Sequence, residues 1–209
     1  MVRGLLLSFS DPNYGIIPTA VPFQYNPSEV TRTIKANGGT AGGPGLRVSA
    51  VPTESYALKL ELDALDALDK PITSRMGVQP LLAAIEAMLE PSGRLGLLQT
   101  GLHALQGAVS IFQKSSPAPI PSPSLPLVVL AWNAVRVVPV RIDSYSAHET
   151  GFSGDLLPVQ ATVDLSLTVL RETDLSHDQR VATFLASAYQ ATRTAMALTG
   201  VAQGVELML

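Results

Sequence analysis

The chain has no cysteine among its 209 residues. This absence excludes disulfide bonds, thiol nucleophiles and thiolate metal sites. The chain also lacks an excess of basic residues, because its 14 lysines and arginines stand against 17 aspartates and glutamates. Since phosphate groups are bound by basic patches, we do not expect nucleic acid as a partner.

Charged residues of both signs are few, at 15% of the chain, whereas hydrophobic residues make up 46%. This composition opposes disorder and favours a large buried core, and the length suits one domain. So few charges leave little polar surface for a freely soluble monomer. The composition therefore favours a protein that buries surface in an assembly.

Long hydrophobic runs are missing as well. The N-terminal segment contains only the three leucines of residues 5–7, too short a run for a signal peptide. The longest weakly charged stretch, residues 95–112, contains Gln99, His103 and Gln106 and does not favour spanning a bilayer. We expect a cytoplasmic protein without membrane insertion.

The clearest pattern is a strict alternation over residues 158–170. One side of an extended chain carries Val159, Ala161, Val163, Leu165, Leu167 and Val169, and the other carries Gln160, Thr162, Asp164, Ser166 and Thr168. Side chains alternate between the two faces of a strand, so this pattern predicts a long strand with one apolar face. Leu165 should be buried and Asp164 should face the other way.

Other segments also predict strands. They are residues 3–9, 21–25, 28–36, 55–63, 127–132 and 135–145, the last extending to Phe152. Pro139 indicates an edge strand or a bulge, because proline cannot donate a backbone hydrogen bond. Trp132 at a strand end indicates core packing, with an interface as the second possibility.

The middle of the chain changes character. Residues 79–89 have apolar residues at helical spacing with Pro80 in the first turn, and residues 95–112 predict a second, looser helix. A proline-rich connector follows at residues 115–126. We interpret residues from about 75 to 126 as a helical and proline-rich insertion in a single domain that spans residues 1–209.

A C-terminal amphipathic helix is expected from Ser176, its N-cap, to about Leu198, with Gly200 beyond its end. Its apolar face would consist of Val181, Phe184, Leu185, Ala188, Thr192, Ala195 and Met196. The whole pattern predicts an α+β fold. We expect a β-sandwich or partly closed β-barrel of about six to eight strands.

Reactive side chains do not gather in the sequence. The three histidines, His103, His148 and His177, lie in separate segments without the spacing of metal ligands. His148 and Glu149 are neighbours in an expected strand, so they face opposite sides and cannot share an acid–base site. We expect no catalytic, metal-binding or cofactor-binding residue, and an enzyme is not favoured.

Two further patterns have a functional and a structural interpretation. Asp63, Asp66 and Asp69 recur every third residue, a spacing that on a helix could align carboxylates for a cation. They follow a strand and precede Pro71, so a charged surface connection is favoured. Residues 37–45, NGGTAGGPG, lack the lysine and the Ser/Thr of a phosphate loop and predict a flexible loop.

Four segments occur in an order that is informative together. Residues 22–32 read PFQYNPSEVTR, residues 58–63 alternate, residues 127–141 hold an apolar strand ending in Trp132, and residues 154–170 lead into the long strand. Together they resemble the tube-protein family of contractile injection systems, the phage-tail-like machines of bacteria. The first segment is similar to that family's opening signature, F-x-Y/F-N-P-x-x-hydrophobic-T/S-R.

Within this family the chain is most similar to the tube-end adaptor, whose tube-like domain often precedes a LysM module on the baseplate side. Asn133 stands where a glycine commonly follows the tryptophan, and Gln160 stands where an arginine is common. The sequence has no LysM segment and has insertions at 37–45 and 115–126. These departures favour an adaptor at the other, cap-proximal end of the tube.

The resemblance implies a structural protein that forms a ring with itself, hexameric as in the family. The ring would join the inner tube to a terminal complex, with tube, sheath and cap or baseplate proteins as partners. A baseplate-side adaptor of the same system is the first alternative. A small-ligand-binding β-barrel of the lipocalin type, with apolar strand faces lining a pocket, is the alternative from another class.

Overall fold

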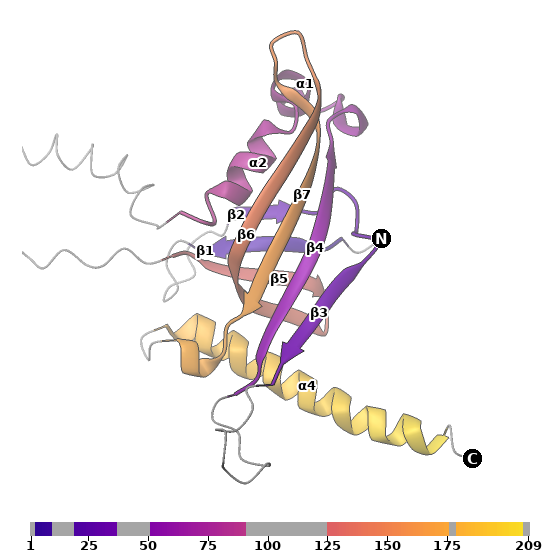
Figure 1. Ribbon diagram of the computed structural model, residues 1–209, viewed down its shortest axis with the longest axis vertical. Coiled ribbons are helices and arrows are strands. Elements are labelled where there is room, and N and C mark those ends of the chain that lie inside the picture. Colours follow the sequence, from indigo (N-terminus) through magenta and orange to yellow (C-terminus); the bar gives the residue numbers. More distant parts are fainter. Residues whose placement is uncertain (1–2, 10–18, 37–50, 91–124, 176–178, 207–209) are drawn as a thin grey trace, which may run out of the picture.

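Seven strands and three helices make up the described part of the computed structural model, which comprises residues 3–9, 19–36, 51–90, 125–175 and 179–206 (Figure 1). The strands are β1 (Leu5–Phe9), β2 (Thr19–Pro22), β3 (Val30–Lys35), β4 (Thr53–Asp63), β5 (Leu127–Asn133), β6 (Arg136–Phe152) and β7 (Pro158–Val169). The helices are α1 (Pro71–Met76), α2 (Gln79–Glu86) and α4 (Arg180–Glu206), with the 3-10 turns η1 (Leu65–Ala67) and η2 (Glu172–Asp174).

All seven strands belong to one antiparallel sheet in the order β2-β1-β5-β6-β7-β4-β3. Figure 1 shows β1, β2 and β5 running across the direction of β4, β6 and β7. The α+β expectation is confirmed, but the strands form a single open sheet rather than the two sheets of a sandwich. The strands form a single sheet because the 17 residues of β6 pair with β5 at one end and with β7 along most of their length.

The long alternating strand is confirmed with its predicted faces. Leu165 is only 3% exposed and lies opposite Leu58 of β4 and Tyr145 of β6. Asp164 is exposed and forms an ion pair with Lys59, with 3.5 Å between the Lys59 Nζ and Asp164 Oδ1 atoms. The period of two therefore assigned the two faces of this interior strand correctly.

Pro139 lies in an interior strand, so the prediction of an edge strand is wrong. The amide of Leu170 donates to the Pro139 carbonyl, 2.9 Å away, just past the last residue of β7. The N–H and C=O groups of one residue point to the same side of a strand. The N–H group that Pro139 lacks would therefore have pointed toward the segment just after the last residue of β7. The irregularity of β6 lies further on, between Ile142 and Ser144.

The core lies on the inner face of the curled sheet. Phe23, Leu6 and Leu130 from one half and Tyr56, Leu60 and Leu167 from the other are at most 2% exposed. Trp132 is partly buried at the margin of the core and packs edge-to-face against Phe23, with ring centroids 6.1 Å apart, so the core interpretation of this tryptophan holds in part. A smaller cluster on the other face joins Leu127 and Val129 of β5 to Ala182 of α4.

Helix α2 occurs where the sequence predicts it, with Leu82 and Ile85 buried in the core. The short helix α1 before it was not predicted. At the junction of the two, Gly77 has φ +58°, and a Cβ atom there would lie 2.1 Å from the Pro158 carbonyl oxygen. Only glycine allows the chain to pass so close to the start of β7.

Helix α4 differs from its prediction in two respects. Its buried residues are Ala182, Ala186 and Tyr189, whereas Phe184 of the predicted apolar face is 71% exposed. The helix also continues through Gly200 instead of ending before it. The expected N-cap Ser176, the loop at 37–45, the helix at 95–112 and most of the proline-rich stretch lie outside the described residues.

We predict opposite effects for two neighbouring substitutions in β7. Leu165→Asp should lower the free energy of unfolding by several kcal/mol, because it places an unpaired carboxylate in the core. Asp164→Asn should change it by less than about 0.5 kcal/mol, because its ion pair with Lys59 is exposed. Thermal unfolding of both variants checks this, and a tolerated Leu165→Asp would contradict the register.

Candidate functional site

The carboxylate of Glu54 is completely buried at the start of β4, where β3 and α4 meet. Its Oε1 atom accepts hydrogen bonds from Arg32 Nε at 2.6 Å, the Tyr189 hydroxyl at 2.6 Å and the Tyr56 hydroxyl at 2.9 Å. Its Oε2 atom accepts one from Arg193 at 2.8 Å. These five residues, here called the Glu54 cluster, connect β3, β4 and α4.

Burial and hydrogen bonding act on the pKa of Glu54 in opposite directions. Desolvation is the largest single effect and raises this pKa, while the hydrogen bonds from Arg32, Tyr189 and Tyr56 and the charge of Arg193 lower it. The donors together prevail, so the pKa lies below its ordinary value of 4.5. A carboxylate held in this way is suited to fixing α4 on the sheet and unsuited to accepting protons near neutrality.

The Glu54 cluster was not predicted from the sequence, although two signals could have revealed it. Glu54 lies on the same strand face as Tyr56 and Leu58, so the period of two places a charge on an apolar face. Tyr189 and Arg193 are four residues apart and share one helix face. The predicted strand began one residue too late to include the glutamate.

The segment at residues 22–32, on which the family resemblance rests, connects the two halves of the sheet through hydrogen bonds. The side chain of Gln24 accepts a hydrogen bond from the Asp63 amide at 2.8 Å, and Asn26 accepts one from the Gly4 amide at 3.1 Å. The Tyr25 hydroxyl donates to Asp66, which raises the pKa of Tyr25 to about 12. Phe23 and Arg32, from the same segment, lie in the core and in the Glu54 cluster.

The acidic residues at spacing three do not converge on a cation site. The carboxylate of Asp63 accepts hydrogen bonds from the Leu65 amide and from the Gln160 side chain, at 2.8 and 2.7 Å. Asp66 belongs to the turn η1 and binds Tyr25. Across the described residues, no group of three histidine, cysteine, aspartate or glutamate residues could hold a metal ion.

His148 is exposed on β6, opposite Thr162, whereas Glu149 lies opposite Ala161. The two side chains therefore face opposite sides of the sheet, as their adjacency in a strand predicts. Asp143 does not approach them, because its carboxylate is bound by Arg141 and Thr168. His103 and His177 lie outside the described residues.

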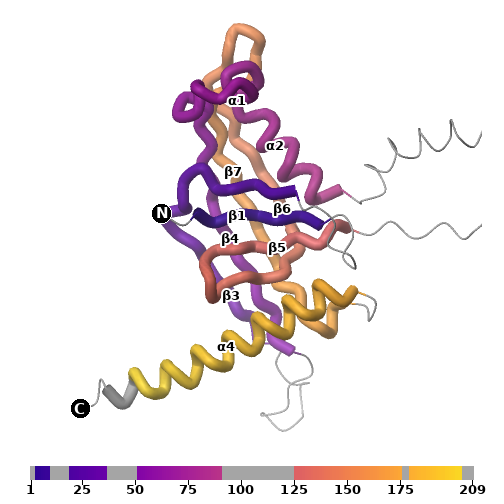
Figure 2. The backbone as a smooth tube through the Cα atoms, turned by 180° about the vertical axis from the view of Figure 1, so that it is seen from behind, coloured from indigo at the N-terminus to yellow at the C-terminus, as the bar shows by residue number. Residues whose placement is uncertain are grey.

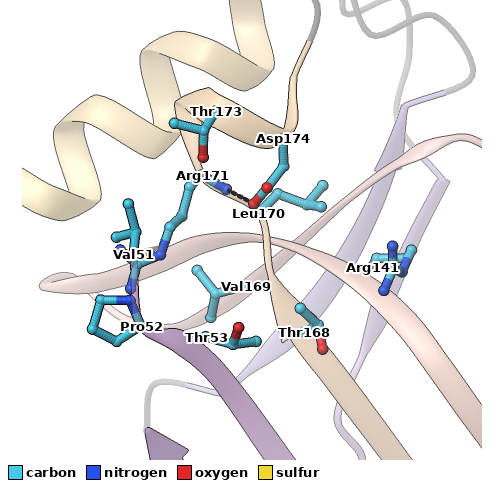
Figure 3. A pocket seen from close by; sticks show the side chains of 10 residues that line it. All are labelled: Val51, Pro52, Thr53, Arg141, Thr168, Val169, Leu170, Arg171, Thr173 and Asp174. Atoms are coloured by element: carbon cyan, nitrogen blue, oxygen red, sulfur yellow. Dashed lines mark hydrogen bonds between the residues drawn. The ribbon is translucent and has the colours of Figure 1, made fainter. Parts of the chain in front are cut away.

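A cleft of about 710 Å³ opens where β7 ends, and Figure 3 shows the residues that line it. Arg171 contributes a buried Nε atom that has no hydrogen-bond partner in the described structure, while its backbone amide donates to Asp174 at 3.0 Å. Arg141 on the other side is bound to Asp143. The lining residues could receive a small anion, but they contain no nucleophile paired with a base.

Two of the surfaces that lack a covering element among the described residues involve the edge and one end of the sheet. The first is the edge strand β3, in which five of six residues are exposed, including Ile34 at 47%. The second is the end of the molecule that carries α1 and the β6–β7 turn, at the top of Figure 1. We call it the tip patch; its apolar members Leu65, Leu68, Ile72, Met76 and Leu156 are 48–80% exposed.

No protein-family model and no curated protein matches this chain. None of the helices in the described ranges combines the length and the apolar character needed to cross a membrane.

Removal of the Glu54 charge should loosen α4. Glu54→Gln leaves Arg32 and Arg193 without their counter-charge, which we expect to cost about 2–4 kcal/mol of unfolding free energy. The expected loss is smaller than the loss for a fully buried ion pair, because the arginine side chains are 35% and 31% exposed. Chemical denaturation measures the loss, with Glu61→Gln, on an exposed position of the same strand, as the control.

The same cluster predicts a pH dependence. Because folding lowers the pKa of Glu54 below 4.5, its contribution is complete above that value and is lost as the pH falls through the folded-state pKa. The stability gap between the native protein and Glu54→Gln should therefore narrow on acidification. Parallel stability curves from neutral into acid pH would contradict this assignment.

Proposed function

We propose that the protein is a structural adaptor ring at the end of the inner tube of a contractile injection system, where it joins the tube to a cap-side complex. The observation that carries the proposal is the open seven-stranded sheet with the exposed edge strand β3. Its other edge is β2. A sheet that ends in two edge strands can continue into neighbouring copies through backbone hydrogen bonds, and a repeated head-to-tail contact closes into a ring.

The tip patch supports a second contact, along the axis of such a ring. Leu156, in the β6–β7 turn, is 80% exposed and has φ 60°, a left-handed conformation that is unfavourable for leucine. Strain and exposure together at an apolar side chain favour a docking role. In the proposed assembly the tip patch faces the tube or the terminal complex.

The alternatives are less well supported. A ligand-binding barrel needs an enclosed apolar cavity, whereas the inner face of this sheet is filled by its own side chains, with Leu60, Val163 and Leu167 at most 2% exposed. An enzyme needs a set of reactive groups, and the described clefts offer none. A baseplate-side adaptor remains the alternative within the same family, because a ring would use the same edges at either end.

Two exposed substitutions test the proposal separately. Ile34→Asp on β3 should prevent ring closure, because it places a desolvated carboxylate at the joint between copies. Ile72→Asp in the tip patch, at a side chain that is 64% exposed, should leave the ring intact but abolish binding to tube ends. The free energy of unfolding of each variant should lie within about 0.5 kcal/mol of the native value.

Light scattering gives the mass of the assembly, and negative-stain images of mixtures with tube subunits give the occupancy of tube ends. A native protein that stays monomeric at micromolar concentration and fails to join tube subunits would contradict the proposal. Unchanged assembly and unchanged tube-end occupancy in both variants would mean that β3 and the tip patch are not the contacts.

A further inference from the structure

The outward face of α4 carries an uninterrupted apolar stripe. Its members are Phe184, Ala188, Ala191, Ala195, Leu198 and Ala202, and every one of them is exposed. Phe184 and Leu198 are 71% and 70% exposed. The helix is attached to the sheet through the opposite face, by Ala182, Ala186, Tyr189 and Arg193.

The spacing of this stripe is that of a helix–helix seam. Successive members are four, three, four, three and four residues apart, which is the heptad repeat of a coiled coil. A solvated helix face would carry polar or charged residues at these positions. The stretch 194–205 contains no charged residue at all, so nothing in it opposes a second apolar helix. The sequence pattern thus predicts a buried face that the described residues do not bury.

The stripe is also complementary to itself. Phe184 and Leu198 lie seven residues before and after Ala191, and the positions between them are alanines. From Phe184 to Leu198, reversing the direction of the helix therefore leaves the order of large and small side chains unchanged. In an antiparallel pair, Phe184 would pack beside Leu198 of the partner subunit, while the alanines let the two backbones approach closely.

The position of α4 leaves room for such a partner. Figures 1 and 2 show the helix crossing below the sheet, with its C-terminal part projecting beyond the strands. Residues 194–203 are all exposed, so the described chain does not cover this part from any side. The part of the stripe that would pair with itself, from Phe184 to Leu198, extends over about 21 Å, enough for several turns of contact.

We propose that α4 pairs antiparallel with α4 of a second copy of this chain, about a two-fold axis at Ala191. Such a contact is self-complementary and closes on two copies, unlike the open-ended contact along sheet edges. It uses neither β2, β3 nor the tip patch, so it can join two subunits or two rings back to back. The inference does not depend on the proposed adaptor function, because it rests on α4 alone.

Single-cysteine variants test the pairing, since the chain has no cysteine of its own. A disulfide needs Cα atoms within about 7 Å of each other. In the antiparallel pair the two copies of residue 191 meet, whereas the two copies of residue 198 are about 21 Å apart along the helices. Under mild oxidation Ala191→Cys should form a covalent dimer and Leu198→Cys should not. A mixture of Ala188→Cys and Ala195→Cys should give a dimer with one copy of each.

Met196→Cys serves as the background control, because Met196 is half exposed but points away from the stripe. Charge substitutions give an independent measurement by light scattering: Leu198→Glu should halve the mass of the native particle, and Met196→Glu should leave it unchanged. Both side chains are exposed, so both variants should stay folded.

Cross-linking of Leu198→Cys as efficiently as Ala191→Cys would indicate a parallel pair and overturn the proposal. The proposal would also be overturned if none of the stripe variants cross-linked above the Met196→Cys background and Leu198→Glu did not change the mass of the native particle. Another protein or another segment would then cover the stripe. Rings that form without these cross-links would refute the pairing and leave the adaptor proposal standing. Cross-linked dimers that never form rings would support the pairing and contradict the adaptor proposal.

Discussion

The buried charge of Glu54 is the interaction on which the arrangement of the lower half of the molecule depends. Four donors from β3, β4 and α4 converge on this one carboxylate. An isolated charge at this depth would be strongly unfavourable, so the helix and the edge strand must be in place for the strand β4 to be stable. Because Arg32 fixes β3 and Arg193 fixes α4, the same interaction sets the position of two surfaces through which we propose that the protein assembles.

Much of the sheet could be predicted from the sequence, because strand faces follow a strict period of two. The faces of β7 and β4 followed from this rule, whereas β5 was predicted from its continuous apolar run. Helix α4 could not be oriented in the same way, because its most regular apolar face points to solvent and its buried face is held by Tyr189 and Arg193. The Glu54 cluster was missed for a related reason: its members lie far apart in the sequence, and each looks ordinary alone. The single curved sheet also depends on long-range pairing that periodicity does not reveal.

The surfaces left uncovered among the described residues each include at least one large apolar side chain that is exposed to solvent. The edge strand β3, the tip patch and the outward stripe of α4 lie on different parts of the molecule and point in different directions. One molecule can therefore make a lateral, an axial and a pairwise contact without competition between them.

The central claim is that the protein forms a ring at one end of the inner tube. Cryo-electron microscopy of assembled particles that carry a label on this protein tests it most directly. The account predicts a single ring of density at the cap-side end of the tube, in which neighbouring copies continue one another's sheets through β2 and β3. Label along the whole tube, or particles with complete tube ends that lack the protein altogether, would contradict it.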